Sequence, residues 1–102
     1  MESNDFLNKL KKTVKQFDSN ADIILYGSRA RNDYKQYSDW DFLILLNYAV
    51  NETLKEQIRN ELFELELETD QIISTIIHSK QNWNDLSITP LHKNIEHDGI
   101  RI

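Results

Sequence analysis

Two stretches of the chain place apolar residues at helical spacing, with charged residues at most of the remaining positions. In residues 3–17 the apolar positions recur every three or four residues between lysines, which predicts an amphipathic helix. In residues 54–65 they recur four, four and three apart, which predicts a second helix packed on one side of a sheet. Asn51 or Thr53 can cap this second helix. The two apolar stripes are Phe6, Leu10, Val14 and Phe17, then Leu54, Ile58, Leu62 and Leu65.

Three short runs rich in apolar or β-branched residues predict strands over 21–26, 40–46 and 69–77. Between the first two runs, a short helix is expected from Ser28 to about Asn32, followed by a polar loop. Beyond the third run, residues 81–89 are polar with a single apolar anchor, Trp83. Pro90 should stop any regular element there, and residues 91–97 can form a short last helix.

The predicted elements follow the order helix, strand, short helix, strand, helix, strand and helix. This order is typical of an α/β layered domain. A chain of 102 residues is long enough for one hydrophobic core but not for two. We therefore expect a single domain over residues 1–102.

The composition of the chain indicates where in the cell the protein is expected and which classes of ligand it is expected to bind. No run of about 18 apolar residues is present, so no membrane span is expected. The chain also lacks cysteine and a signal-peptide pattern, which favours the cytoplasm. A formal net charge of −5 argues against tight nucleic-acid binding, because that requires a cationic face.

The most informative motif is a Gly-Ser turn followed, after ten residues, by two aspartates one residue apart. Gly27 and Ser28 follow the first predicted strand, whereas Asp39 and Asp41 lie at the start of the second. Side chains two apart on a strand point to the same face, so the two carboxylates should project together. Oxygen-only ligation suits Mg²⁺, and two such ions can hold the attacking and leaving oxygens of a displacement.

The turn supplies groups suited to a phosphate. Gly27 lets the backbone approach a phosphate closely, and Ser28 with the amides that follow it can bind the leaving pyrophosphate. Arg29 or Arg31 can add positive charge for a triphosphate such as ATP, although both can equally be surface cations. These four residues are the predicted nucleotide-binding residues.

A third carboxylate would complete the metal site. Asp70 is expected to open the third strand, so it reaches the same edge as Asp39 and Asp41 if the strands are neighbours. There it can bind the catalytic metal and accept the proton of an attacking hydroxyl. Glu68 is the alternative, although it is expected on the solvent face of the helix end. An Asp-x-Asp pair alone is a weak signal, and the Gly-Ser turn at this spacing makes the combination strong.

The chain resembles the minimal nucleotidyltransferases of the DNA polymerase beta superfamily. The resemblance rests on Gly27-Ser28, the Asp39-x-Asp41 pair, the stretch Gly-Ser-Arg-Ala-Arg and the ending from Pro90 to Gly99, and it covers essentially the whole chain. It implies an α+β fold with a small mixed sheet flanked by helices. It also implies that Asp39 and Asp41 bind the metals and that Asp70 is the third carboxylate. Asn32 stands where the family often has glycine, which is tolerable because Asn accepts left-handed backbone angles.

The resemblance further implies a partner. Proteins of this kind are typically encoded beside a small helical HEPN protein, a toxin, and act as its antitoxin, in some cases by adding AMP to a tyrosine of the toxin. We therefore expect a metal-dependent transfer of AMP from ATP to a partner hydroxyl. Two alternatives stay open, namely a non-catalytic antitoxin that neutralises its partner by occlusion and a small-molecule nucleotidyltransferase of the antibiotic-modifying type.

Overall fold

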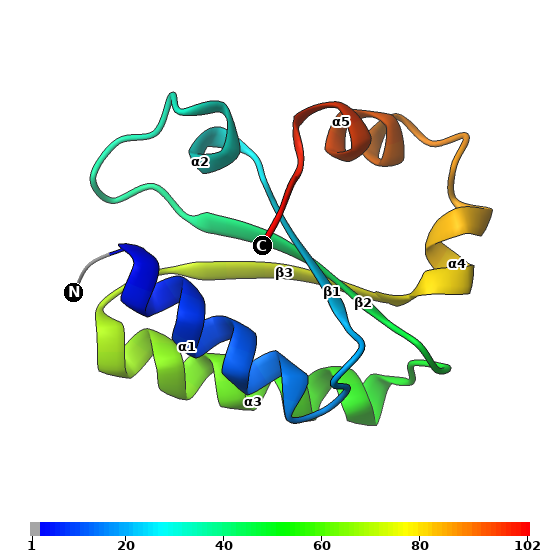
Figure 1. The fold of residues 1–102 in the computed structure, drawn as a ribbon, viewed down its shortest axis with the longest axis horizontal. Coiled ribbons are helices and arrows are strands. Elements are labelled where there is room, and N and C mark those ends of the chain that lie inside the picture. Colours follow the sequence, from blue (N-terminus) through cyan, green and yellow to red (C-terminus); the bar gives the residue numbers. More distant parts are fainter. Residues whose placement is uncertain (1–2) are drawn as a thin grey trace.

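The computed structural model describes residues 3–102, so the first two residues of the predicted domain lie outside it. Helices and strands alternate along most of the chain (Figure 1). In order, they are α1 (Ser3–Lys15), β1 (Asp22–Tyr26), α2 (Ser28–Arg31), β2 (Trp40–Leu46), α3 (Glu52–Thr69), β3 (Ile73–Ser79), α4 (Lys80–Asp85), α5 (Pro90–Asp98) and β4 (Ile100–Arg101).

The four strands form one mixed sheet in the order β3-β2-β1-β4. β2 is antiparallel to β1 and parallel to β3, and α3 provides the long crossover that a parallel pair requires. Tyr26 on β1 and Ser74 on β3 are the two register partners of Asp41 on β2. The end of β1 and the beginnings of β2 and β3 therefore meet at one end of the sheet.

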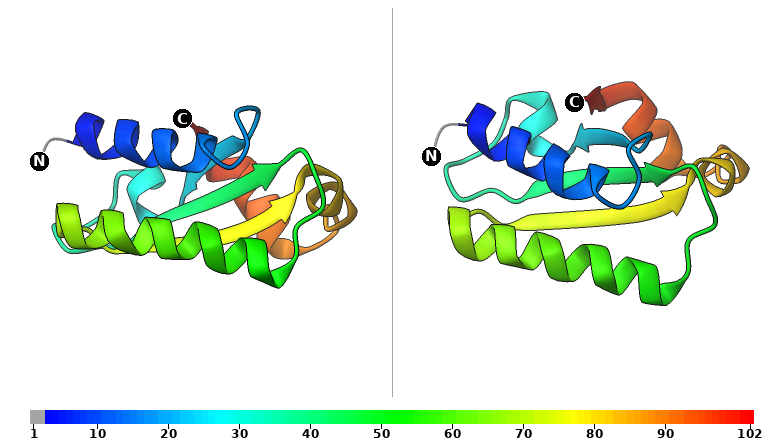
Figure 2. Two further views of the ribbon diagram at one scale, coloured as in Figure 1. Left: turned by 90° about the horizontal axis from the view of Figure 1, so that it is seen from below. Right: turned by 60° about the horizontal axis from the view of Figure 1, so that its bottom comes forward.

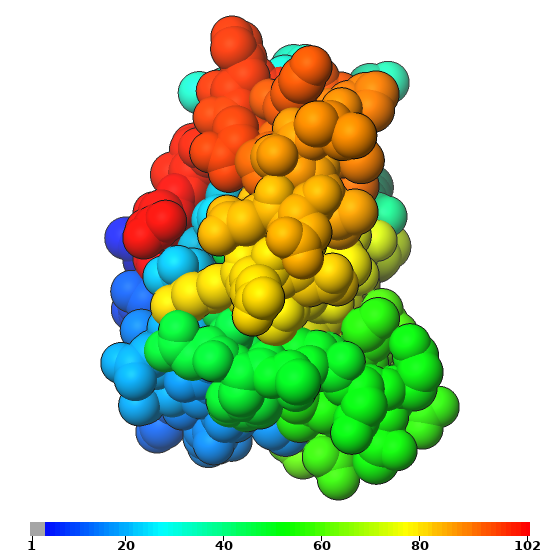
Figure 3. Space-filling model, turned by 90° about the vertical axis from the view of Figure 1, so that its right-hand side faces the viewer, coloured from blue at the N-terminus to red at the C-terminus, as the bar shows by residue number. Residues whose placement is uncertain are grey.

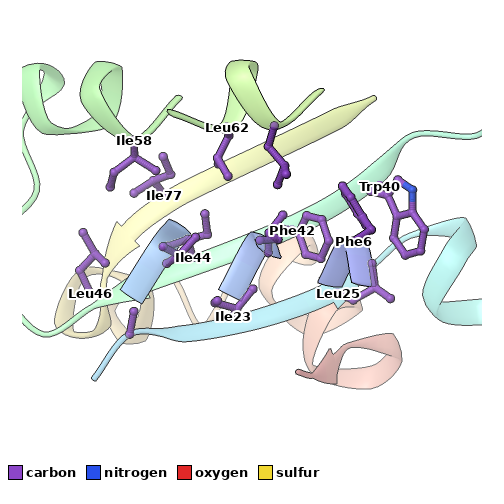
Figure 4. Packing of buried hydrophobic residues seen from close by; sticks show 14 residues of the cluster. Phe6, Ile23, Leu25, Trp40, Phe42, Ile44, Leu46, Ile58, Leu62 and Ile77 are labelled. Atoms are coloured by element: carbon purple, nitrogen blue, oxygen red, sulfur yellow. The ribbon is translucent and has the colours of Figure 1, made fainter. Parts of the chain in front are cut away.

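The larger apolar core lies between the sheet and the helix pair α1 and α3, which run side by side across one face (Figures 2 and 4). Both predicted helical stripes point into this core. Phe6, Leu10 and Val14 on α1 are buried, as are Ile58, Leu62 and Leu65 on α3. The Asn51 side chain caps α3 by accepting a hydrogen bond from the Leu54 N–H at 2.8 Å.

A smaller core covers the opposite face of the sheet. Leu43 and Leu45 pack there against Trp83 of α4 and Ile95 of α5. The Trp83 ring also stacks on His92, with the ring centroids 4.4 Å apart. Figure 3 shows α4 and α5 stacked above the connection from β2 to α3. Because β2 is covered on both faces, its continuous apolar run is explained, and Trp83 is confirmed as a core anchor.

Two predicted boundaries are wrong. The third strand begins at Ile73 rather than at residue 69, because α3 continues to Thr69. The buried Thr69 hydroxyl donates to the Leu65 carbonyl oxygen at 2.7 Å, so this β-branched residue is accommodated in the helix. Pro90 does not stop a regular element, since it is the first residue of α5, where its missing N–H costs nothing.

The sequence also missed two elements beyond β3. The polar segment that follows β3 starts with the helix α4. Ser79 caps this helix, because its hydroxyl accepts a hydrogen bond from the Asn82 N–H at 3.0 Å. β4 is a two-residue strand that pairs with β1.

Within residues 3–102, none of the helices combines the length and the apolar character needed to cross a bilayer.

Candidate functional site

Gly27 forms the turn between β1 and α2, and its backbone is in a conformation that favours glycine. Its φ is 74°, and its carbonyl oxygen accepts hydrogen bonds from the N–H groups of Ala30 and Arg31, each at 3.1 Å. A Cβ atom built on Gly27 would collide with Oδ2 of Asp41 and lie 3.2 Å from its Cγ. The Gly-Ser turn and the aspartate pair, twelve residues apart in sequence, are therefore in direct contact.

Asp39 and Asp41 lie at the mouth of β2, as the sequence predicts. Asp41 faces the side of the sheet covered by α4 and α5, since its register neighbours two residues on, Leu43 and Ile76, pack there. Trp40 and Phe42 point to the opposite face and into the larger core. Asp39 is exposed and Asp41 is partly buried, so one carboxylate is anchored against the turn while the other faces solvent.

The surroundings of Asp41 favour its protonated form. Burial raises the pKa of the Asp41 carboxyl, the negative charge of Asp39 raises it further, and Arg31 acts in the opposite direction. Tyr26, opposite Asp41 on β1, has its pKa raised by burial and by the Asp41 charge. A divalent cation between the two carboxylates would remove their mutual repulsion, which is the electrostatic reason to expect one there.

Arg29 holds the loop that leads to the aspartates. Its Nε and Nη2 donate to the Ser38 carbonyl oxygen at 3.2 and 3.0 Å, and Nη2 also donates to the Gln36 carbonyl oxygen at 3.2 Å. The guanidinium lies over the rings of Tyr34 and Trp40, 4.5 and 4.2 Å from their centroids. This loop-holding role was missed in the sequence, where Arg29 was expected either at the nucleotide or at the surface.

Arg31 remains beside the site. Its Nε donates to Oδ2 of Asp33 at 3.2 Å, and its Nη1 lies 3.8 Å from Oδ2 of Asp98 on α5. Its side chain is 47% exposed, and its charge acts on Asp41. Of the two arginines in the motif, Arg31 is therefore the one whose charge is available to a ligand at the turn.

Asp70 does not open the third strand, contrary to the prediction. It is the C-cap of α3, with a left-handed backbone at φ 60°, and its N–H donates to the Glu66 carbonyl oxygen at 2.9 Å. The next residue, Gln71, accepts a hydrogen bond from the indole Nε1 of Trp40 at 2.8 Å. The turn after α3 is thus attached to Trp40, whose side chain lies on the opposite face from Asp41.

Glu68, the alternative third carboxylate, forms an ion pair with Lys9 of α1. Within the described part of the chain, no group of three or more His, Cys, Asp or Glu side chains is placed to hold a metal ion. The predicted convergence of Asp39, Asp41 and Asp70 is therefore not found. Two carboxylates fit a cation that takes its remaining ligands from water and substrate phosphates, which is the usual mode for Mg²⁺.

Comparison with known proteins identifies the family of the chain. A family model described as a nucleotidyltransferase domain matches residues 7–101. MJ0141 of Methanocaldococcus jannaschii, provisionally named a protein adenylyltransferase, is 34% identical over 82 residues, which cover 78% of this chain and 83% of MJ0141.

Two solved structures share the fold. One is a crystal structure of a toxin–antitoxin with AMP-PNP, with a TM-score of 0.65 and 16% identity over 92% of this chain and 69% of that one. The other is a mutant of the toxin–antitoxin MntA-HpeT, with a TM-score of 0.64 and 17% identity over 94% of this chain and 70% of that one. Fold, motif and family match agree, and the chain belongs to the nucleotidyltransferase domain family.

Proposed function

We propose that this nucleotidyltransferase moves AMP from ATP onto a hydroxyl of a partner protein. The observation that carries the proposal is the contact between Gly27 and the Asp41 carboxylate. This contact supports the proposal because the turn has amides that can bind phosphate, and Asp41 is one of two carboxylates that can bind a divalent cation. The relationship to MJ0141, provisionally named a protein adenylyltransferase, supports a protein as the acceptor and adenylate as the transferred group.

Each residue of the site has a role in this proposal. Gly27 has no side chain to cap α2, so the first amides of that helix remain for a phosphate. Ser28 adds a hydroxyl at the same turn, and Arg31 adds positive charge. Asp39 and Asp41 would hold Mg²⁺, which when bound neutralises the phosphates and orients the α-phosphorus.

The transfer is a single displacement at phosphorus. The acceptor oxygen forms a bond to the α-phosphorus while the bond from that phosphorus to the bridging oxygen breaks. Pyrophosphate leaves with the electron pair, and the proton of the acceptor goes to water or to a base on the partner. Asp39 and Asp41 fix the geometry from one side, and the turn at Gly27 holds the departing phosphates.

The acceptor can be the size of a protein because the site is open. Asp39 is exposed, and Tyr37 in the adjoining loop is 83% exposed. Solved relatives of the fold are toxin–antitoxin structures, one of them with AMP-PNP, which favours a toxin as the partner. We propose a HEPN-type toxin with a tyrosine as the acceptor, so that modification neutralises the toxin.

The experiment is co-expression with the protein encoded by the neighbouring reading frame, followed by intact-mass spectrometry and label transfer from α-³²P-ATP. We expect the partner to gain the mass of one or more AMP groups with the wild-type chain and none with Asp39→Ala/Asp41→Ala. A double variant at exposed acidic residues of α3 and α4, Glu56→Ala/Asp85→Ala, removes the same charge away from the site and should modify the partner normally. A partner neutralised equally well by wild type and Asp39→Ala/Asp41→Ala, without added mass, would instead favour occlusion.

A further inference from the structure

Three side chains from three strands form a row at the mouth of the sheet. Asp41 on β2 is the register partner of Tyr26 on β1 and of Ser74 on β3. Register partners on neighbouring strands lie about 4.8 Å apart and point to the same face. Ser74 is therefore the side chain of β3 that stands beside the aspartate pair.

The faces of the neighbouring positions support this placement. Two residues further along the strands, Leu43 and Ile76 are partners and both pack in the smaller core. The positions between them face the other way: Phe42 is the register partner of Thr75 and Ile44 that of Ile77, and Phe42, Ile44 and Ile77 are buried in the larger core. The alternation leaves Ser74 on the face of Asp41, and Ser74 is exposed rather than packed.

Charge determines what this position can hold. A divalent cation held by Asp39 and Asp41 takes its remaining ligands from water and the nucleotide phosphates, whereas a second cation on the β3 side of the pair would need a carboxylate from β3. The nearby acidic residues do not provide it, since Asp70 is the C-cap of α3, Glu68 is paired with Lys9, and no three His, Cys, Asp or Glu side chains within residues 3–102 are grouped to hold a metal ion. The Ser74 hydroxyl is neutral, and Arg31 already brings a positive charge to this end of the sheet.

We infer that this site holds one carboxylate-bound cation rather than the two that the motif predicts, and that Ser74 occupies the position from which a second would be held. The inference rests on the proposed function. It means that no carboxylate of β3 takes the proton of the acceptor hydroxyl, so that proton leaves to water or to the partner. It also identifies Ser74 as the residue that determines how many ions the site can bind.

The test counts Mn²⁺, used as a probe for Mg²⁺, in the full chain saturated with a non-hydrolysable ATP analogue. Equilibrium dialysis or electron paramagnetic resonance should find one bound ion per wild-type chain. Ser74→Asp should bind two, because it places a third carboxylate next to Asp41. Ser74→Asn, which stays neutral, and Ser87→Asp, which adds the same charge between α4 and α5, should each bind one.

A second measurement checks that the new carboxylate lies beside the pair. In EDTA, Ser74→Asp should melt below Ser74→Asn because a third negative charge faces Asp41, and Mn²⁺ with the analogue should reverse that order. Two ions in the wild type, or one ion in a folded Ser74→Asp variant, would overturn the inference and leave the proposed function standing. No bound analogue and no bound ion in the wild type would overturn both.

Discussion

Gly27 meets two constraints that no other residue type satisfies together. Its φ of 74° is strained for residues with a Cβ, and the Cβ would collide with the Asp41 carboxylate. Asn32, the C-cap at the other end of α2, has a similar φ of 65°, and its N–H donates to the Ser28 carbonyl oxygen. Comparing substitutions at Gly27 and Asn32 therefore separates the cost of backbone strain from the cost of displacing Asp41.

We therefore expect Gly27→Ala to lose activity far beyond its loss of stability. Asn32→Ala should cost about 1–2 kcal/mol of unfolding free energy, since it forces alanine into the left-handed helical region. Gly27→Ala should cost about 1–3 kcal/mol, since a φ of 74° with a ψ of −157° is a conformation that glycine alone adopts readily. Only Gly27→Ala should reduce nucleotide transfer, by at least tenfold, because the carboxylate must move. Thermal melting and transfer rates of the two variants check this, and equal loss of activity in both would contradict it.

Asp41 makes the stability of the metal-free protein depend on pH. Burial raises its pKa above the usual 3.8, and the Asp39 charge adds to the rise. The folded protein then holds the Asp41 proton more tightly than the unfolded chain, so stability falls as the pH rises from 3.8 through the raised pKa. Asp41→Asn removes this loss together with the repulsion from Asp39.

In EDTA at pH 7, Asp41→Asn should therefore melt above wild type, by about 2–4 °C, which corresponds to roughly 0.5 kcal/mol in a domain of this size. The difference should disappear below pH 3.8, where both proteins carry an uncharged group at this position. Melting curves across this pH range measure it. If Asp41→Asn melts lower at neutral pH, the carboxylate has a stabilising hydrogen-bonding role instead.

The residues of the motif were predicted where local sequence determines position. Gly27, Asp39 and Asp41 each border an apolar strand, so their places at strand ends followed from the pattern. Asp70 was misplaced because a β-branched threonine before it was assigned to a strand rather than to the last turn of α3. The place of Ser74 beside Asp41 was not predicted, since it depends on the register between β2 and β3. That register pairs residues 33 apart in sequence.

At the level of elements, Arg29 of α2 makes several of the contacts that hold the loop of residues 33–39 between α2 and β2. Arg29 donates to two carbonyl oxygens of this loop and stacks on Tyr34 and Trp40. The loop ends at Asp39, so its order contributes to the position of that carboxylate. Loops exposed to solvent lose order readily when their few fixed contacts are removed.

Arg29→Ala should therefore loosen the loop more than the fold. We expect the unfolding free energy to fall by about 1–3 kcal/mol, because hydrogen bonds from a charged group and a cation–π contact are lost. Faster amide exchange should be confined to residues 33–39. Arg29→Lys should recover only part of this, because an ammonium lacks the planar fork. Hydrogen exchange of the three proteins tests the idea, and unchanged exchange in the loop of Arg29→Ala would refute it.

Element boundaries were predictable where they depend on local chemistry. β2 was predicted with its observed bounds, and Asn51 was one of two predicted caps of α3. α4 and β4 were missed because tertiary contacts stabilise them: α4 is anchored by buried Trp83 on the sheet, and β4 exists only by pairing with β1. Short elements gain little from intrinsic propensity, so their sequence signal is weak.

For the molecule as a whole, charge and site together limit the ligand. The net charge of −5 disfavours a long nucleic acid, whereas the turn, Arg31 and a bound cation provide positive charge at one end of the sheet. A nucleotide held there would contact β1, β2 and α2 together. Its binding should therefore stabilise the entire fold, and only when the divalent cation is present.

We expect ATP with Mg²⁺ to raise the melting temperature by about 10–20 °C at a ligand concentration roughly 100-fold above Kd, since such binding stabilises the folded state by about 2.7 kcal/mol. The same ATP in EDTA should give a far smaller shift, because the triphosphate then faces two unneutralised carboxylates. Asp39→Ala/Asp41→Ala should show little difference between Mg²⁺ and EDTA, while Glu56→Ala/Asp85→Ala should behave as wild type. An equal shift with and without Mg²⁺ in the wild type would mean that the nucleotide binds away from the aspartate pair.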